Sequence, residues 1–155
     1  MARRLRAVAT AAAILCGATI GLQAAAQQAQ ETPSEDELYE RPYIGEICGD
    51  NVVSRKLYNG ARRYGNFCHR CHGEAGLGSS FAPSLVDSLR RLSREQFEDV
   101  VVNGRKNLVA GQEKVMPSFG HVTDVVLYRE DIYAYLKAVS DGELKPGPLQ
   151  RGCES

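Results

Sequence analysis

Five consecutive residues in the middle of the chain have the types and spacing needed to hold a metal-containing cofactor. They form a C-x-x-C-H motif, Cys68-His69-Arg70-Cys71-His72. Two thiols at this spacing can add across the two vinyl groups of haem, and the adjacent imidazole can reach the iron. We therefore expect Cys68 and Cys71 to attach one haem c covalently and His72 to be an axial ligand of its iron.

Chance, a zinc site and a thiol redox pair are weaker interpretations of this motif. A chance occurrence is rare at the cysteine and histidine frequencies of this chain. A zinc site needs a second pair of ligands, and His121 with one distant cysteine is a poor pair. A thioredoxin-type redox pair should follow a strand in a βαβ unit, which the sequence does not indicate. The motif and its context therefore favour haem attachment.

A haem held in this way needs a sixth ligand or keeps an open site. Met116 is the only methionine besides Met1, and Pro117 follows it directly. Because proline lacks a backbone donor and fixes its own φ, this segment cannot continue as a helix and could present the thioether sulfur to a buried iron. An ordinary core methionine and ligation by His121 are the alternatives. We expect Met116 to be the second axial ligand.

The N-terminal residues have the pattern of a secretory signal peptide, which we assign to 1–26. Three arginines precede an uncharged apolar run at 7–22, and three alanines at 24–26 supply the small-residue cleavage pattern. A transmembrane anchor is disfavoured because the run is short and rich in alanine. We expect a periplasmic protein with no stable membrane insertion after cleavage.

Length and charge limit the remaining chain to one domain with no nucleic-acid partner. The protein has 155 residues, with 19 basic and 19 acidic side chains, so its formal net charge is zero. No overall basic field draws it to nucleic acid. We divide the chain after the signal peptide into an acidic arm at 27–53, a domain at 54–141 and a tail at 142–155. The arm should be extended or poorly ordered.

Apolar spacing predicts three helices in the domain. Ser54 is a candidate N-cap for the first, which runs straight to Cys68. Ser93 caps a second helix that should end at Asn103-Gly104, and a third spans about 129–139.

The segments between these helices predict loops rather than strands. Residues 73–83 and 111–123 are interrupted by glycine and proline, and the first segment is also rich in serine. No segment shows a convincing alternation of apolar and polar residues. The predicted fold class is therefore all-α.

These residues resemble class I c-type cytochromes. The resemblance is carried by Gly60 and Tyr64 ahead of the C-x-x-C-H motif and by 131–137, which is similar to the C-terminal helix of that family. It implies that the N- and C-terminal helices cross around one covalently attached haem. At the crossing, Gly60 would let the two backbones approach closely.

The same resemblance implies roles for residues around the haem. The segment 82–85 is similar to the family's proline-containing turn, so the Pro83 carbonyl would accept the Nδ1 proton of His72. The haem walls implied by the resemblance are Leu85, Phe119 and Leu136.

One subgroup is more similar than the rest, the periplasmic cytochromes associated with methanol and alcohol metabolism. The similar segments are 78–85, 101–106 and 115–120, whereas Val126-Leu127-Tyr128 lacks a cysteine found in the subgroup. The resemblance implies a one-electron carrier rather than an enzyme. It would accept electrons from a PQQ-dependent methanol or alcohol dehydrogenase and pass them to another cytochrome or a terminal oxidase.

Two further functions stay open from the sequence. One is a haem enzyme or gas sensor with a labile sixth ligand site. The second is a structural module in which the C-x-x-C pair holds zinc or forms a disulfide.

Cys48 and Cys153 are the two cysteines left over after signal cleavage and haem attachment. In an oxidising periplasm an even remainder predicts a disulfide, here between the acidic arm and the tail. Two unpaired cysteines in flexible ends are the alternative, because the sequence cannot show whether their Cα atoms come within about 7 Å.

A concentration of basic residues surrounds the expected haem-binding segments and could steer an acidic partner toward the haem edge. The alternative is a set of solvated helix faces with one or two arginines on the haem propionates. The residues are Arg62, Arg63, Arg70, Arg90, Arg91, Arg94, Arg105 and Lys106.

Overall fold

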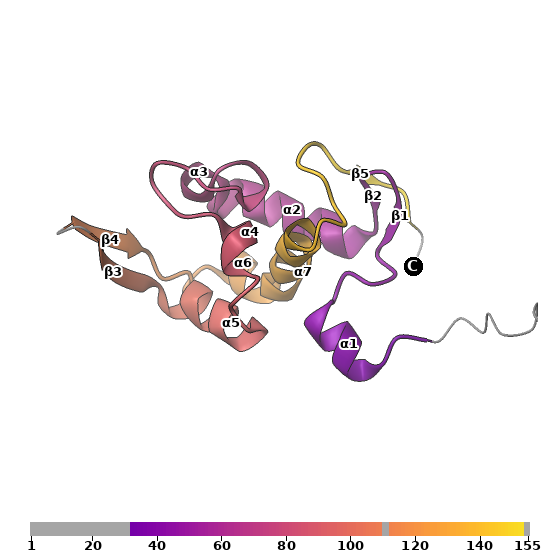
Figure 1. Cartoon of the computed structure of the whole chain (residues 1–155), viewed down its shortest axis with the longest axis horizontal. Helices are drawn as coiled ribbons and strands as arrows, with labels where there is room; N and C mark the ends of the chain where they lie inside the picture. Colours follow the sequence, from indigo (N-terminus) through magenta and orange to yellow (C-terminus); the bar gives the residue numbers. More distant parts are fainter. Residues whose placement is uncertain (1–31, 110–111, 154–155) are drawn as a thin grey trace, which may run out of the picture. The chain divides into compact units, whose positions relative to one another are not determined.

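The computed structural model describes residues 32–109 and 112–153 (Figure 1). The signal peptide expected at 1–26 lies outside the described residues. Within the described part, none of the helices combines the length and apolar character that a membrane span requires.

Helices predominate, and the three expected from the sequence are present. Along the chain the elements are α1 (Glu35–Glu40), β1 (Ile47–Gly49), β2 (Val52–Val53), α2 (Arg55–Phe67), α3 (His69–His72), η1 (Glu74–Gly76), α4 (Leu85–Ser88), α5 (Arg94–Asn103), β3 (Arg105–Val109), β4 (Gln112–Met116), α6 (Thr123–Leu127), α7 (Arg129–Ser140) and β5 (Gln150–Arg151). Ser54 caps α2 by accepting a hydrogen bond from the Leu57 N–H, and Ser93 forms a capping box with Gln96 at the start of α5. Side-chain capping therefore defines where both helices begin.

The core is centred on the contact between α2 and α7, which lie side by side (Figure 1). Gly60 of α2 is buried against the backbone of α7, and a Cβ at this position would collide with the carbonyl oxygen of Asp131. The rings of Tyr64 and Tyr135 pack on each other across the interface, with centroids 5.8 Å apart. The close approach expected at Gly60 is thus present in the structure.

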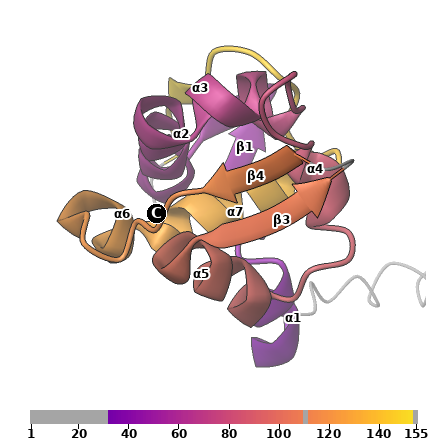
Figure 2. The same ribbon diagram turned by 90° about the vertical axis from the view of Figure 1, so that its left-hand side faces the viewer.

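The prediction of an all-α fold is wrong in one respect, because the described residues also form two small sheets. One has the strand order β1-β2-β5, with β1 antiparallel and β5 parallel to β2; the second is the antiparallel hairpin β3–β4 (Figure 2). Strands of two to five residues show too little alternation to be recognised locally. The segment at 111–123 was expected to be loop throughout, but it contains the whole of β4.

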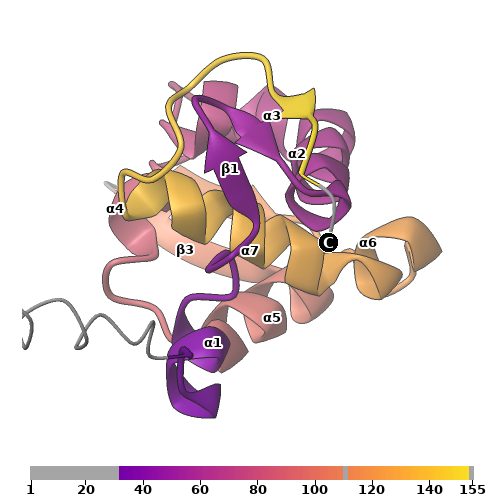
Figure 3. The same cartoon turned by 90° about the vertical axis from the view of Figure 1, so that its right-hand side faces the viewer.

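The acidic arm is also more ordered than expected. Ser34 caps α1, and β1 and β2 follow within the segment for which an extended or poorly ordered chain was predicted. Its order depends on distant partners: Tyr43 donates a hydrogen bond to Asp141, and β2 pairs with β5 near the C-terminus (Figure 3). Local composition could not reveal either partner.

Cys48 and Cys153 form a disulfide, with their Cα atoms 5.7 Å apart, which confirms the pairing expected from the sequence. The bond joins the end of the described chain to β1. It therefore ties the three-stranded sheet together across a sequence separation of 105 residues.

Replacing both Cys48 and Cys153 by serine should lower the thermal unfolding midpoint of the haem-loaded protein. In the chain-entropy model, opening so long a loop removes up to about 4 to 5 kcal/mol of stability. Circular dichroism with increasing temperature measures the change. A thiol reductant should lower the midpoint of the unsubstituted protein and leave the double variant unaffected; equal midpoints for both proteins without reductant would contradict a stabilising bond.

Candidate haem-binding site

The attachment motif lies at the junction of α2 and a single following helical turn. The Cys68 carbonyl accepts hydrogen bonds from the backbone N–H groups of Cys71 and His72, at 3.1 and 3.0 Å. This turn brings the two cysteines and the imidazole close together. Neither Cys68 nor Cys71 is in a disulfide, and His72 is buried, with 7% of its surface exposed.

A hydrogen bond to the proline-containing turn at 82–85 sets the orientation of His72. Its Nδ1 lies 3.0 Å from the carbonyl oxygen of Pro83. Because a carbonyl can only accept, Nδ1 must carry a proton, and in the neutral ring the lone pair is then on Nε2. That is the protonation state required of an imidazole that ligates a metal through Nε2.

The loop between His72 and Pro83 is held by backbone geometry that requires glycine. Gly73 and Gly78 have φ angles of 74° and 91°, and a Cβ at Gly78 would lie 2.8 Å from the Ser84 nitrogen. The N–H of Gly78 donates to the His72 carbonyl at 2.7 Å, and the hydroxyl of Tyr64 donates to the Gly73 carbonyl. Burial raises the pKa of Tyr64, so this hydroxyl stays protonated. No local signal in the sequence reveals this bond.

Met116 lies at the end of β4, in a segment fastened to the C-terminal end of α5. Its side chain is half-buried and packs against the core. The N–H groups of Phe119 and Gly120 donate to the carbonyls of Val101 and Val102, each at 3.0 Å. These bonds anchor the loop that follows Met116. His121, the alternative ligand, is exposed.

Apolar side chains connect the attachment motif with the Met116 loop. Phe67, at the end of α2, meets Phe119 edge to face, with ring centroids 6.5 Å apart. Leu85, the first residue of α4, is half-buried against the same core. Two cysteines free to react, an imidazole with an available Nε2 and apolar walls fit a haem macrocycle.

The described residues favour neither a zinc site nor a redox role for the two thiols. Residues 32–109 and 112–153 contain no group of three or more His, Cys, Asp or Glu side chains able to hold a metal ion. Burial raises the pKa of the Cys68 thiol to about 11, with a further contribution from Cys71. A redox-active thiol requires the opposite shift, toward a stable thiolate.

Two of the arginines expected to steer a partner form contacts within the protein instead. Arg63 pairs with Asp124 at 3.2 Å and stacks on the ring of Tyr128. Arg94 pairs with Glu98 and Glu130, at 3.1 and 3.0 Å. Their side chains are only 17% and 13% exposed. Neither is available to an incoming partner, whereas Arg62, Arg70 and Arg91 are exposed.

This helical fold and the C-x-x-C-H site define a c-type cytochrome, and comparisons with known proteins agree. A family model described as "Cytochrome C oxidase, cbb3-type, subunit III" matches residues 55–136. The chain is 37% identical over 106 residues to cytochrome c-553I of Paracoccus denitrificans, covering 68% of this chain and 47% of that protein. It is 37% identical over 100 residues to cytochrome c-555 of Methylococcus capsulatus, covering 64% and 75% of the two chains.

A solved structure shows the same fold. The c-type cytochrome XoxG of Methylobacterium extorquens AM1 superposes with a TM-score of 0.57 and 31% identity, over 73% of this chain and 82% of that one. The chain therefore belongs to the class I cytochrome c family. It carries haem c, attached through Cys68 and Cys71. It spans about half the length of its Paracoccus relative.

Proposed function

We propose that this protein is a periplasmic monohaem cytochrome c that carries single electrons and has no substrate chemistry of its own. His72 and Met116 are its axial ligands. The observation that supports the proposal is the hydrogen bond from His72 Nδ1 to the Pro83 carbonyl, which leaves the other ring nitrogen for the iron. Bound haem supplies the one-electron chemistry of its iron.

The protein's contribution is to position the ligands and keep water from the iron. Pro83 orients His72, and the bonds from α5 hold the segment that carries Met116. Leu85 and Phe119 supply apolar surface around the macrocycle, which lowers the local dielectric. A thioether in the sixth position disfavours the haem enzyme or gas sensor, since both need that position to be open or labile.

The same proposal divides the chain by function. Residues 1–26 are the export signal, 27–53 the acidic arm, 54–141 the haem-binding domain and 142–155 the tail. Export delivers the chain to the oxidising compartment in which the disulfide of Cys48 and Cys153 persists.

A PQQ-dependent methanol or alcohol dehydrogenase is the proposed electron donor, and another cytochrome or a terminal oxidase the acceptor. The segments at 78–85, 101–106 and 115–120 support this donor. Similarity to cytochromes of Methylococcus and Methylobacterium supports it further. Exposed arginines such as Arg62 would steer an acidic face of the dehydrogenase toward the haem.

Reduction of the oxidised cytochrome by a reduced quinoprotein dehydrogenase of the same organism should slow as salt rises. Stopped-flow measurements between 0.01 and 0.1 M ionic strength cover a fall in Debye length from about 30 to about 10 Å. Arg62→Glu should lower the low-salt rate about tenfold. Arg151→Glu, the same change on the exposed strand β5, is the control and should have a smaller effect.

The two parts of the proposal can fail separately. A reduction rate that changes neither with salt nor with the Arg62→Glu substitution would exclude electrostatic steering. Failure of any such dehydrogenase to reduce the protein would exclude the donor while leaving the electron-carrier function intact.

A further inference from the structure

The hairpin β3–β4 ends at Met116, and its register places two cations on the same face as that methionine. Arg105 pairs directly with Met116, and Asn107 with Lys114. Residues directly opposite in an antiparallel pair project from the same face, and so do alternate residues along a strand. Arg105, Asn107, Lys114 and Met116 therefore share one face of the hairpin, which we call the Met116 face.

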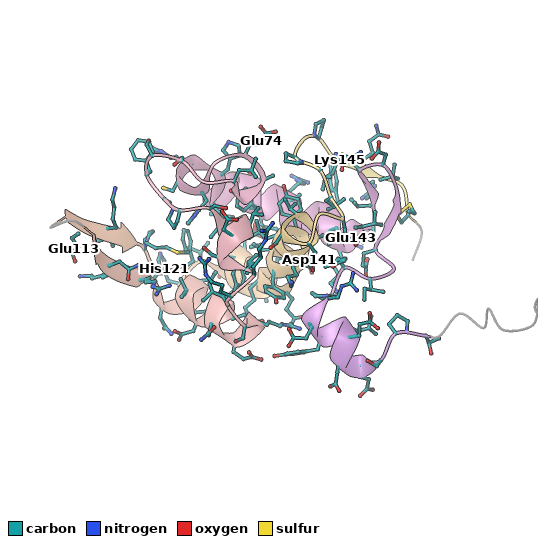
Figure 4. All side chains as sticks on the ribbon, in the orientation of Figure 1. Glu74, Glu113, His121, Asp141, Glu143 and Lys145 are labelled. Atoms are coloured by element: carbon teal, nitrogen blue, oxygen red, sulfur yellow. A yellow bond between two sulfur atoms is a disulfide. The ribbon has the colours of Figure 1, made fainter. Side chains whose placement is uncertain are left out.

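The opposite face of the hairpin is exposed and its charges are balanced. Lys106 pairs with Val115 in the register, and its ammonium lies 3.7 Å from the carboxylate of Glu113. Figure 4 shows Glu113 on the hairpin, away from the helices. Val115 is 58% exposed. A lysine next to Arg105 in the sequence thus lies on the other face, already paired with an acid.

The cations on the Met116 face have no such partner. In the described part of the chain, neither Arg105 nor Lys114 forms an ion pair with a carboxylate. The base of the hairpin is fixed, because Gly104 has a φ of 76° and a Cβ there would lie 2.7 Å from the Met116 carbonyl oxygen. Arg105 is therefore held beside the methionine proposed to ligate the haem iron.

We propose that Arg105, supported by Lys114, binds a propionate of the haem. This inference rests on the proposed ligation by Met116. Haem c carries two carboxylates at its rim, and a guanidinium matches a carboxylate with two parallel hydrogen bonds. A fixed positive charge near the iron disfavours the ferric state, which has one more positive charge than the ferrous state. Arg105 therefore raises the reduction potential.

The test compares two neighbouring basic residues that lie on opposite faces. In the haem-loaded full chain, Arg105→Met should lower the midpoint potential, with a fall of about five- to tenfold in the equilibrium constant for reduction at constant pH and salt. It should also shift the propionate bending band in the resonance Raman spectrum. Lys106→Met should change neither, and Arg105→Lys should restore most of the potential.

Equal shifts in Arg105→Met and Lys106→Met, or none in either, would overturn the proposal. If Arg105→Met yields no haem-loaded protein, Lys114→Met takes its place and should lower the midpoint potential by a smaller amount. A Lys114→Met variant with an unchanged potential would also overturn the proposal. The near-red charge-transfer band of sulfur-ligated iron should persist in every variant. Lack of that band in the unsubstituted protein would instead exclude Met116 as a ligand. The Raman comparison would still decide whether Arg105 contacts a propionate.

Discussion

Met116→Ala should abolish the weak sulfur-to-iron charge-transfer band in the near red spectrum of the oxidised protein and lower the reduction potential. A thioether stabilises the ferrous state relative to the ligands that would replace it, such as water or histidine. Axial ligation contributes to a range of about 0.8 V across haem proteins, so the decrease should be easily measured. Visible spectroscopy and potentiometric titration measure the two effects.

Val115→Ala is the matched control for this substitution. Val115 precedes Met116 in β4, is largely exposed and lies on the other face of the hairpin. It should leave the band and the potential unchanged. A band that survives Met116→Ala would exclude the methionine ligand, and His121→Ala would then test the alternative.

Gly60→Val should destabilise the haem-loaded protein by about 3 kcal/mol or more. The new Cβ would collide with backbone atoms of Asp131 and Ile132 in α7, which cannot rotate away as a side chain can. The helices α2 and α7 must then separate, which opens the core beside the attachment motif. Denaturant unfolding of the purified holoprotein measures the change.

Gly65→Ala provides the control in the same helix. Gly65 is exposed, and a Cβ there meets no other atom within 4 Å. Its replacement should be neutral or stabilise the protein by up to about 1 kcal/mol, because glycine is a poor residue in a helix. A Gly60→Val variant as stable as Gly65→Ala would contradict the close packing of the two helices.

The helices that surround the site could be predicted because their signals are local. Ser54 and Ser93 lie directly before the helices they cap, and the apolar spacing of α2 and α7 repeats within one turn or two. The family resemblance added the contact at Gly60 and the hydrogen bond from His72 to the Pro83 carbonyl. Both contacts are present in the structure, while the ligand roles of His72 and Met116 remain proposals.

The environment of individual charges could not be predicted in this way. Arg62 and Arg63 are adjacent in the sequence, yet Arg62 is exposed, whereas Arg63 is stacked on Tyr128 and paired with Asp124. The same limit applies to Arg105 and Lys106, which the hairpin register places on opposite faces. Which cation can meet a partner or a cofactor depends on residues distant in the chain.

The sequence by itself determined the covalent chemistry of this protein, because thiol addition to haem requires only two cysteines and a histidine at a fixed short spacing. It also determined the main helices, whose caps and apolar faces are local. The tertiary structure alone decided the two sheets, the order of the acidic arm and the face of the hairpin on which Arg105 lies. These features depend on strand pairing and on contacts between distant segments, and the free energy of such contacts exists only once the chain has folded.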